Sequence, residues 1–420
     1  MRAWIAVLLC LPAAGQQKLT LDSAVAIALK SNPRLAIDRI NAMVSQEVVN
    51  EVRSGLYPAI FANTTAAGAT TDSRIAAGGL NNPIIFNRYA AGASFGQLIT
   101  DFGRTANLVQ STRLRARSQQ EAIEALQAQV VLAVHRAYYS ALRAMGVLRV
   151  AEETEKSRGV AVEQVTALAK SNLKSTLDVT FAQVNLSEAK LTVLAARNER
   201  LQAMADLSLV LGFATPQTFE LEDVPALGEA PPAAEALIAE AKQNRAELTS
   251  LRTERQAAAT QLIAERKLTL PTLSALGAAG VAPVHDDRLK NRYAAAAINL
   301  NIPVFNGGLF QARRREAELR VQAIDQRIRD LEGQIAREVT VAVTNGQTAF
   351  ERIAVTAQLL EQAKLSADLA QERYALGLSS IVELSQAQLN QTAAEIRNTA
   401  ARYDYLAQRA MIDFQAGRLK

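Results

Sequence analysis

The chain has 420 residues and a formal net charge of +5 that is spread along the sequence without a basic block. Nucleic-acid-binding surfaces gather Lys and Arg on one face with interleaved aromatic residues, so this charge pattern argues against nucleic acid as a partner. The length allows two or three ordinary domains or one elongated domain, and the single cysteine, Cys10, excludes a disulfide framework.

Residues 1–16 have the pattern of a secretory signal peptide. Arg2 supplies the charged start, Ala3 to Leu11 the apolar run, and Ala13-Ala14-Gly15 the small-residue cleavage site. The run is shorter than the ~20 apolar residues of a membrane-spanning helix. No later stretch resembles such a helix, so any insertion into a membrane is expected to be by strands. We expect no lipid anchor, because Leu9 stands where a lipid-modification site has a small residue.

Helical periodicity marks residues 19–55, with a break at Asn32-Pro33 and an end at Tyr57-Pro58. From residue 59 to 99 it is replaced by Ala, Gly, Thr, Ser and Asn with isolated aromatic residues. This texture predicts two strands around a Gly/Asn/Pro loop at Thr71 to Asn87.

A single long helix is predicted from Thr105 to about Ala169, and about 65 residues at 1.5 Å each make it on the order of 100 Å long. Helices of that length occur in coiled coils and helical tubes rather than in globular domains. Asn172 then tolerates the left-handed conformation that ends a helix. Ser175 and Asp178 have the spacing of a capping box, so a second helix is expected to begin there.

The same turn and cap recur 205 positions later, at Gly377, Ser380 and Glu383. The ends of the helices that follow the two turns, Gly212 and Gly417, are also 205 positions apart. Copies at a fixed distance indicate an internal repeat. We therefore expect two helical hairpins, each preceded by a pair of strands.

Two periodicities support this reading. In the last helix the apolar positions fall seven residues apart, which predicts helices packed side by side as in a coiled coil; they are Val382, Leu389, Ile396, Tyr403 and Ala410. In the second strand pair, Ile298 to Ile302 alternates apolar and polar residues. That alternation is typical of a strand with one face in lipid and the other in water.

Four strands of about 11 residues each have the length needed to cross a bilayer when tilted. They cannot close a barrel alone, because about eight strands is the minimum and open edges are excluded from lipid. The chain is therefore expected to oligomerise. Three copies would supply twelve strands, with the helical hairpins continuing as a tube.

The tip sequence Tyr374-Ala375-Leu376-Gly377, followed by Ser380 to Leu384, resembles the periplasmic hairpin tip of the TolC-like outer-membrane efflux proteins. Leu19 to Ala24 and Ile302 to Gly308 are similar to the same family. The resemblance implies a mainly α fold with a small β part: a homotrimeric duct of a coiled-coil α-barrel and a twelve-stranded transmembrane β-barrel, four strands from each protomer. It also implies an outer-membrane location reaching into the periplasm, with outer-membrane lipid, a periplasmic adaptor (membrane fusion protein) and an inner-membrane pump of RND, ABC or MFS type as partners.

The resemblance carries a few residues with it. Tyr374 and Asp178 correspond to a hydrogen-bonded pair that holds the periplasmic entrance shut. Glu383 and Gln386 correspond to a constricting ring that is often acidic, so Gln386 makes this entrance less negative. The adaptor is expected to meet grooves around four residues of the tips: Leu173, Ser175, Leu378 and Ser379.

The sequence offers little for catalysis or metal binding. His285-Asp286-Asp287 makes a poor metal site because its members are adjacent, and Gly307-Gly308 lacks the Lys that follows in a phosphate-binding loop. We expect no cofactor, no metal and no enzyme activity, so energy for transport must come from a partner. The competing hypothesis is a soluble periplasmic coiled-coil adaptor or scaffold, which would explain the hairpins but not two strand pairs joined to helices by prolines.

The expected organisation divides the chain into eight segments. They are a signal peptide (1–16), periplasmic or equatorial helices (17–57), a first β-hairpin (58–100), a first long helical hairpin (101–212, tip near 170–178), an equatorial connector (213–240), a helix (241–270), a second β-hairpin (271–303) and a second long helical hairpin (304–417, tip near 374–383).

Overall fold

The computed structural model describes residues 18–68, 70, 87–224, 229–285 and 290–419. The predicted signal peptide, most of the predicted loop at 71–87, and Asp286 and Asp287 lie outside the described residues. Two compact units are present, each built from several segments. The first contains residues up to Asp38, Ile123–Ala246 and the chain from Glu332 onward, and the second contains Arg39–Ala122 and Glu247–Leu331.

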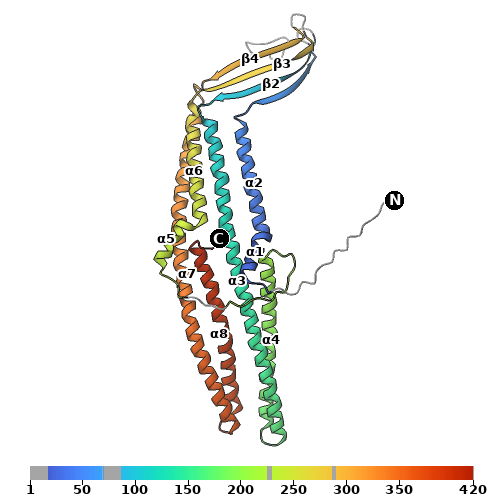
Figure 1. Ribbon diagram of the computed structural model, residues 1–420, viewed down its shortest axis with the longest axis vertical. Helices are drawn as coiled ribbons and strands as arrows, with labels where there is room; N and C mark the ends of the chain where they lie inside the picture. Colours follow the sequence, from blue (N-terminus) through green and yellow to red (C-terminus); the bar gives the residue numbers. More distant parts are fainter. Residues whose placement is uncertain (1–17, 69, 71–86, 225–228, 286–289, 420) are drawn as a thin grey trace, which may run out of the picture. The chain divides into compact units, whose positions relative to one another are not determined.

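The two halves of the chain contain helices and strands in the same order, two helices, two strands and then two long helices (Figure 1). The elements are α1 (Leu21–Ser31), α2 (Pro33–Ser54), β1 (Ala59–Ala67), β2 (Arg88–Thr100), α3 (Arg104–Lys170), α4 (Thr176–Val210), α5 (Ala234–Asn244), α6 (Ala246–Arg266), a 3₁₀ turn (Lys267–Thr269), β3 (Thr272–Val284), β4 (Arg292–Asn301), α7 (Leu309–Ala375) and α8 (Ile381–Gln415).

Two boundaries differ from the sequence-based expectation. Helix α2 begins at Pro33 itself, because the first position of a helix needs no amide hydrogen. Helix α5 begins at Ala234, inside the segment expected to be an equatorial connector (213–240). Its Ala-Glu-Ala-Leu-Ile-Ala-Glu-Ala composition has high helix propensity once the two prolines at 231 and 232 have passed. No helix among the described residues is long and apolar enough to cross a bilayer.

The second unit contains an antiparallel four-stranded sheet in the order β1-β2-β3-β4. Its pairing register aligns Ile60 with Phe95, Phe95 with Gly277, and Gly277 with Ala296, so these residues share one face. Side chains alternate between the two faces of a strand, so Ile298 and Leu300 lie on the same face as Ala296. Both are more than half exposed. The opposite face carries polar residues, among them Asn63, Ser94, Ser274, Asn299 and Asn301.

A tyrosine covers two paired glycines in this sheet. Gly92 of β2 lies opposite Gly280 of β3, and Gly280 lies opposite Tyr293 of β4. A Cβ atom built on Gly92 would lie 2.3 Å from Tyr293 Oη, and one built on Gly280 would lie 2.5 Å from the same oxygen. Backbone oxygens are as close, Ala279 O at 2.7 Å from the first Cβ position and Ala91 O at 2.5 Å from the second, so the neighbouring strands and the Tyr293 side chain together require glycine at both positions.

The two strand-to-helix junctions have the same backbone shape. Before α3, Phe102 and Gly103 both have positive φ, at 56° and 83°, and Gly307 and Gly308 before α7 have φ of 62° and 84°. Asp101 holds the first junction by accepting hydrogen bonds from the Gly103 amide at 3.0 Å and the Thr105 amide at 2.7 Å. Burial acts to raise its pKa, but these hydrogen bonds prevail and lower the pKa of Asp101.

The core of the first unit surrounds Tyr138 of α3, whose side chain is fully buried. The Tyr138 hydroxyl lies 2.7 Å from the carbonyl oxygen of Leu19 and 2.7 Å from that of Glu222. Leu19 also forms a parallel bridge with Leu221, so one tyrosine ties together two chain segments distant in sequence. Burial raises the pKa of Tyr138 to about 12.

The internal repeat also appears where the second helix of each hairpin ends. Gly212 has a φ of 88°, and a Cβ atom there would lie 2.6 Å from the backbone oxygen of Ser31. Gly417 has a φ of 75°, and its Cβ would lie 3.0 Å from the Cβ of Asn244. Each glycine thus lets a helix end close against the turn between two short helices.

Candidate functional site: the paired hairpin tips

Both helical hairpins of the first unit turn at the same end of that unit (Figure 1). We call residues 170–178 the first tip and residues 374–383 the second tip. In the first tip, Asn172 takes the left-handed conformation with a φ of 57°. The amide of Leu173 then donates a hydrogen bond of 2.9 Å to the carbonyl of Leu168, which closes the end of α3.

The second tip has the same turn. Gly377 has a φ of 74°, and the amide of Leu378 donates to the carbonyl of Arg373 at 2.8 Å. Each of these positions lies 205 residues after its counterpart in the first tip. Asn172 therefore ends α3 in the left-handed conformation, as Gly377 ends α7. For a residue with a Cβ atom this conformation costs a small amount of conformational energy.

The two tips differ in how their caps are completed. Ser175 caps α4, and the Asp178 carboxylate accepts a hydrogen bond of 3.0 Å from the Ser175 amide, so the capping box is complete. Ser380 caps α8 through the amide of Glu383 at 3.3 Å. The Glu383 carboxylate instead pairs with Arg373 across the turn at 3.1 Å. The second tip therefore replaces half of its capping box with an ion pair.

Packing joins the two hairpins near their tips. A small apolar cluster contains Tyr374, Ile381 and Leu384 of the second hairpin, with Phe181 of α4 packed against it. Just beyond this cluster, Asn185 Nδ2 donates a hydrogen bond of 2.7 Å to Ser385 Oγ. Side chains of the first hairpin thus support the buried face of the second.

Tyr374 is buried, and its hydroxyl forms no hydrogen bond of ordinary geometry with the described residues. The Tyr374–Asp178 hydrogen bond expected from the resemblance stays a prediction; the Asp178 carboxylate accepts two hydrogen bonds from its own cap at Ser175. Asp178 still lies close by. Burial raises the pKa of Tyr374, and the charge and hydrogen-bonding capacity of the nearby Asp178 carboxylate raise it further.

Glu383 and Gln386 lie one helical turn apart at the start of α8, and both are exposed. Gln386 donates a hydrogen bond of 3.2 Å to Asn390, which continues the same helical face. The two residues of the predicted ring therefore lie on one face of α8, and only one of the two, Glu383, is acidic.

Of the four residues expected to meet an adaptor, Leu173 and Leu378 are strongly exposed, at 69% and 67%. Ser175 is exposed but uses its side chain for capping. Ser379 differs, since its hydroxyl oxygen is buried and has no hydrogen-bond partner among the residues that the structure describes. Three further apolar residues of the tips, Leu177, Leu376 and Val382, are exposed as well, and apolar residues next to a polar turn are the sequence signal for them.

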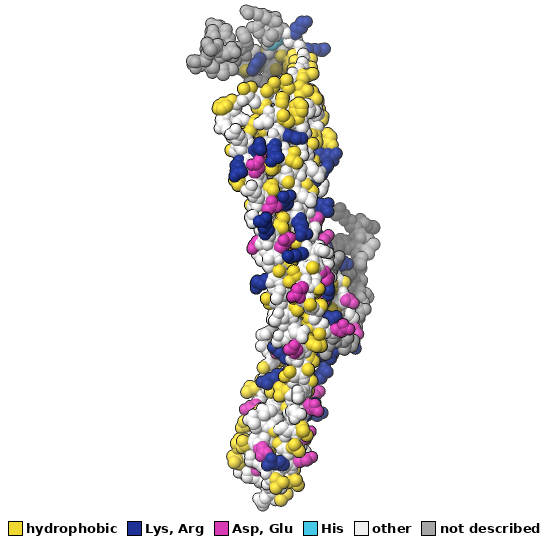
Figure 2. Space-filling model, turned by 90° about the vertical axis from the view of Figure 1, so that its left-hand side faces the viewer, with side chains coloured by type: hydrophobic (Ala, Val, Ile, Leu, Met, Phe, Trp, Pro, Cys, Tyr) yellow, Lys and Arg dark blue, Asp and Glu magenta, His cyan; other side chains and the backbone are white. Residues whose placement is uncertain are grey.

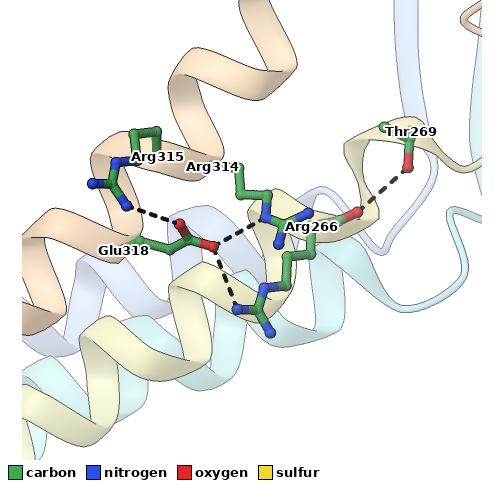
Figure 3. Close-up of polar contacts among 5 residues, drawn as sticks. All are labelled: Arg266, Thr269, Arg314, Arg315 and Glu318. Carbon is green, nitrogen blue, oxygen red and sulfur yellow. Dashed lines mark hydrogen bonds and ion pairs between the residues drawn. The ribbon is translucent and has the colours of Figure 1, made fainter.

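The second unit carries a cluster of positive charge near the helical end of its sheet. Glu318 accepts contacts from three guanidinium groups (Figure 3): Arg314 at 3.0 Å, Arg266 at 3.5 Å and Arg315 at 3.6 Å. One carboxylate facing three arginines leaves an excess of positive charge. Figure 2 shows Lys and Arg side chains directly beneath the apolar side chains that cover the strands.

The described residues contain no group of three His, Cys, Asp or Glu side chains that could hold a metal ion. His135 packs edge-on against Tyr139 in the interior of the first unit, and burial lowers its pKa.

Comparison with known proteins agrees with this geometry. A family model described as outer membrane efflux protein matches residues 24–213 and 237–418. Outer membrane protein TolC of Salmonella enteritidis is 22% identical over 401 residues, which cover 93% of this chain and 80% of that protein. The solved structure of the outer-membrane channel OprN superimposes with a TM-score of 0.81 at 18% identity, covering 94% of this chain and 89% of that one. The structure of CusC gives a TM-score of 0.79 at 19% identity, covering 96% and 93%.

An open four-stranded sheet joined to paired long helical hairpins is thus the fold of TolC-type channel subunits. The chain belongs to the outer membrane efflux protein family. It acts in the outer membrane as an efflux channel, a transport protein rather than an enzyme.

Proposed function

We propose that three copies of this chain form the outer-membrane duct of a tripartite efflux or type I secretion system. The observation that carries the proposal is the open sheet: β1 and β4 are its two outer strands, and neither has a partner on its outer side among the described residues. Unpaired strand edges are not tolerated in lipid. Pairing β1 of one copy with β4 of the next removes every edge, and three copies of four strands make a closed ring of twelve.

The two faces of the sheet support the same arrangement. The face with Ile60, Phe95 and Ile298 is apolar and suits the hydrocarbon of the membrane. The opposite face, with Asn63, Ser274 and Asn299, suits a water-filled lumen. Segments 58–100 and 271–303 are then the membrane part, and segments 101–212 and 304–417 the periplasmic tube.

Outer-membrane lipid is a further partner in this proposal. Arg266 lies six residues before the first residue of β3, and Arg314 lies six residues into α7. If the strands span the hydrocarbon, these side chains lie close to the phosphate groups of the periplasmic leaflet. Their excess charge over Glu318 then favours the anionic headgroups.

The tips are the proposed periplasmic entrance. Exposed leucines at Leu173, Leu376 and Leu378 offer an apolar surface for a periplasmic adaptor, which in turn connects to an inner-membrane pump. We place Tyr374, Asp178, Glu383 and Gln386 at the constriction. A wide duct confers little selectivity, so the pump rather than this chain selects the cargo.

The proposal is tested by membrane fractionation followed by mass measurement. The mature protein is expected to remain with outer membranes after a high-salt wash, and its detergent complex to have three times the mass of the chain. In planar bilayers it should form ion-conducting pores. Recovery of a single, water-soluble subunit from the periplasm would instead support a scaffold role.

A further inference from the structure

Lys174 lies in the first tip, between the turn at Asn172 and the cap at Ser175, and it is half-buried. Its ammonium nitrogen lies 3.6 Å from the centre of the Tyr374 ring in the second tip. The same nitrogen donates a hydrogen bond of 3.0 Å to the carbonyl oxygen of Tyr374. One side chain of the first hairpin therefore makes two different contacts with one residue of the second.

Both contacts suit a cation at this place. The face of a tyrosine ring attracts an ammonium group through its quadrupole. The Tyr374 carbonyl belongs to the last turn of α7, where helix ends carry partial negative charge and cations are favoured. A neutral side chain of similar length would keep the packing but lose both attractions.

The internal repeat shows that this link is one-sided. The position equivalent to Lys174 in the second tip is Ser379, and the position equivalent to Tyr374 in the first hairpin is Ala169. Neither an ammonium group nor a ring is available for the reciprocal contact. The link is therefore a property of these particular residues and not of the repeated hairpin fold.

We propose that Lys174 is a positioning residue for the closed entrance: it latches the second tip to the first within each protomer. The latch uses the ring face and the carbonyl of Tyr374, and it does not use the hydroxyl. This inference rests on the proposed channel function, since opening of the entrance requires the two tips to separate.

The test is the conductance of the purified full-length channel in planar bilayers. Lys174→Met should raise the open fraction roughly two- to thirty-fold, the equilibrium equivalent of one cation–π contact. Lys174→Arg should stay close to the unmodified protein. Lys170→Met is the matched control, because it removes an equal charge at an exposed position in the last turn of α3.

Two variants of Tyr374 distinguish the contribution of its ring from that of its hydroxyl group. Tyr374→Phe keeps the ring face and the carbonyl, so it should open the channel much less than a variant that removes the ring. Tyr374→Leu removes the ring but keeps the carbonyl, so it should open the channel no more than Lys174→Met does, and the double variant no further than Lys174→Met alone.

Three results would overturn the latch: no increase with Lys174→Met, an equal increase with Lys170→Met, or opening by Tyr374→Phe as large as by Tyr374→Leu. Each variant is first checked for its trimeric mass, so that misassembly is not read as opening. If the unmodified protein forms no pores at all, the channel proposal itself fails and the latch fails with it. Pores that are indifferent to Lys174 reject the latch alone.

Discussion

Asn185 and Ser385 are joined by a hydrogen bond of 2.7 Å, which connects α4 to α8 near the tips. Asn185 and Ser385 do not correspond to each other in the internal repeat, because the counterpart of Asn185, 205 positions later, is Asn390. The bond therefore links the hairpins at a staggered level. It provides a place to test whether separation of the hairpins opens the channel.

Replacing both residues by cysteine should lock the hairpins together. The only native cysteine, Cys10, lies in the predicted signal peptide, so the engineered pair has no competitor in the mature protein. Under oxidising conditions the Asn185→Cys, Ser385→Cys variant should conduct less than the unmodified channel and recover on addition of a thiol reductant. A matched pair, Ser187→Cys with Ser385→Cys, places one thiol on an exposed part of α4 and should show no such change.

Gly212 should not tolerate a side chain. Gly212→Ala adds a Cβ atom that would lie 2.6 Å from a backbone oxygen of Ser31 at a positive φ, and we expect a loss of about 1–3 kcal/mol. Thermal unfolding followed by circular dichroism at the helical minimum measures it. Gly159→Ala is the control, because Gly159 is inside α3 with no atom within 4 Å of its Cβ position. That change should raise stability by about 0.5–1 kcal/mol.

Tyr138→Phe should weaken the first unit by about 1–3 kcal/mol, because the buried hydroxyl proton that the Leu19 and Glu222 carbonyls share is lost, although the Leu19 oxygen keeps the Glu222 amide as a donor. The unmodified protein should also show an alkaline transition that the variant lacks. The pKa of Tyr138 is raised from 10.0 to about 12, so its contribution is complete below pH 10 and is lost as the pH rises toward 12. Urea unfolding at several pH values tests this; equal pH dependence in both proteins would contradict it.

Gly280→Val should prevent correct assembly of the sheet, since Tyr293 Oη and the Ala91 carbonyl oxygen each lie 2.5 Å from the Cβ position. The nearest atom to a Cβ at Gly277 is 3.6 Å away, so Gly277→Ala should be tolerated. The readout is the yield of heat-resistant oligomer from outer membranes. Normal assembly of the valine variant would show that Tyr293 does not cover the glycine pair.

Gln386→Glu should increase the preference of the channel for cations, because it adds a carboxylate one helical turn from Glu383 on the exposed face of α8. The reversal potential across a salt gradient measures this preference, and the effect should shrink at high ionic strength. Gln371→Glu adds the same charge at an exposed position of α7 before the tip and serves as control. If both variants shift the potential equally, Gln386 has no special place at the entrance.

Much of the fold follows from local pattern. The long helices, the strand pairs and both turns were predictable because periodicity, prolines and the residues at Asn172 and Gly377 act over a few positions. The antiparallel sheet and the mainly helical architecture agree with the family resemblance. Helix α5 was missed because its helix-forming composition follows a Pro-rich connector that dominated the local signal.

The contacts between hairpins were not predictable in the same way. Lys174 and Tyr374 are 200 residues apart, and nothing in either local sequence indicates that they meet. The partner expected for Tyr374 from the family pattern, Asp178, has its carboxylate in its own capping box, and its bond to Tyr374 stays a prediction. Whether a carboxylate bonds its own helix cap or a residue distant in sequence depends on the three-dimensional geometry, which the spacing of residues in the sequence does not give.

The one-sided contact of Lys174 with Tyr374 has a consequence for the symmetry of the assembled entrance. A ring of three such chains contains six hairpins, which their common fold would arrange with nearly sixfold symmetry. Only three of the six seams between them contain the ammonium–ring pair, and these alternate with three seams between neighbouring chains. An opening that begins at the unlinked seams would therefore have a triangular outline rather than widen evenly like an iris.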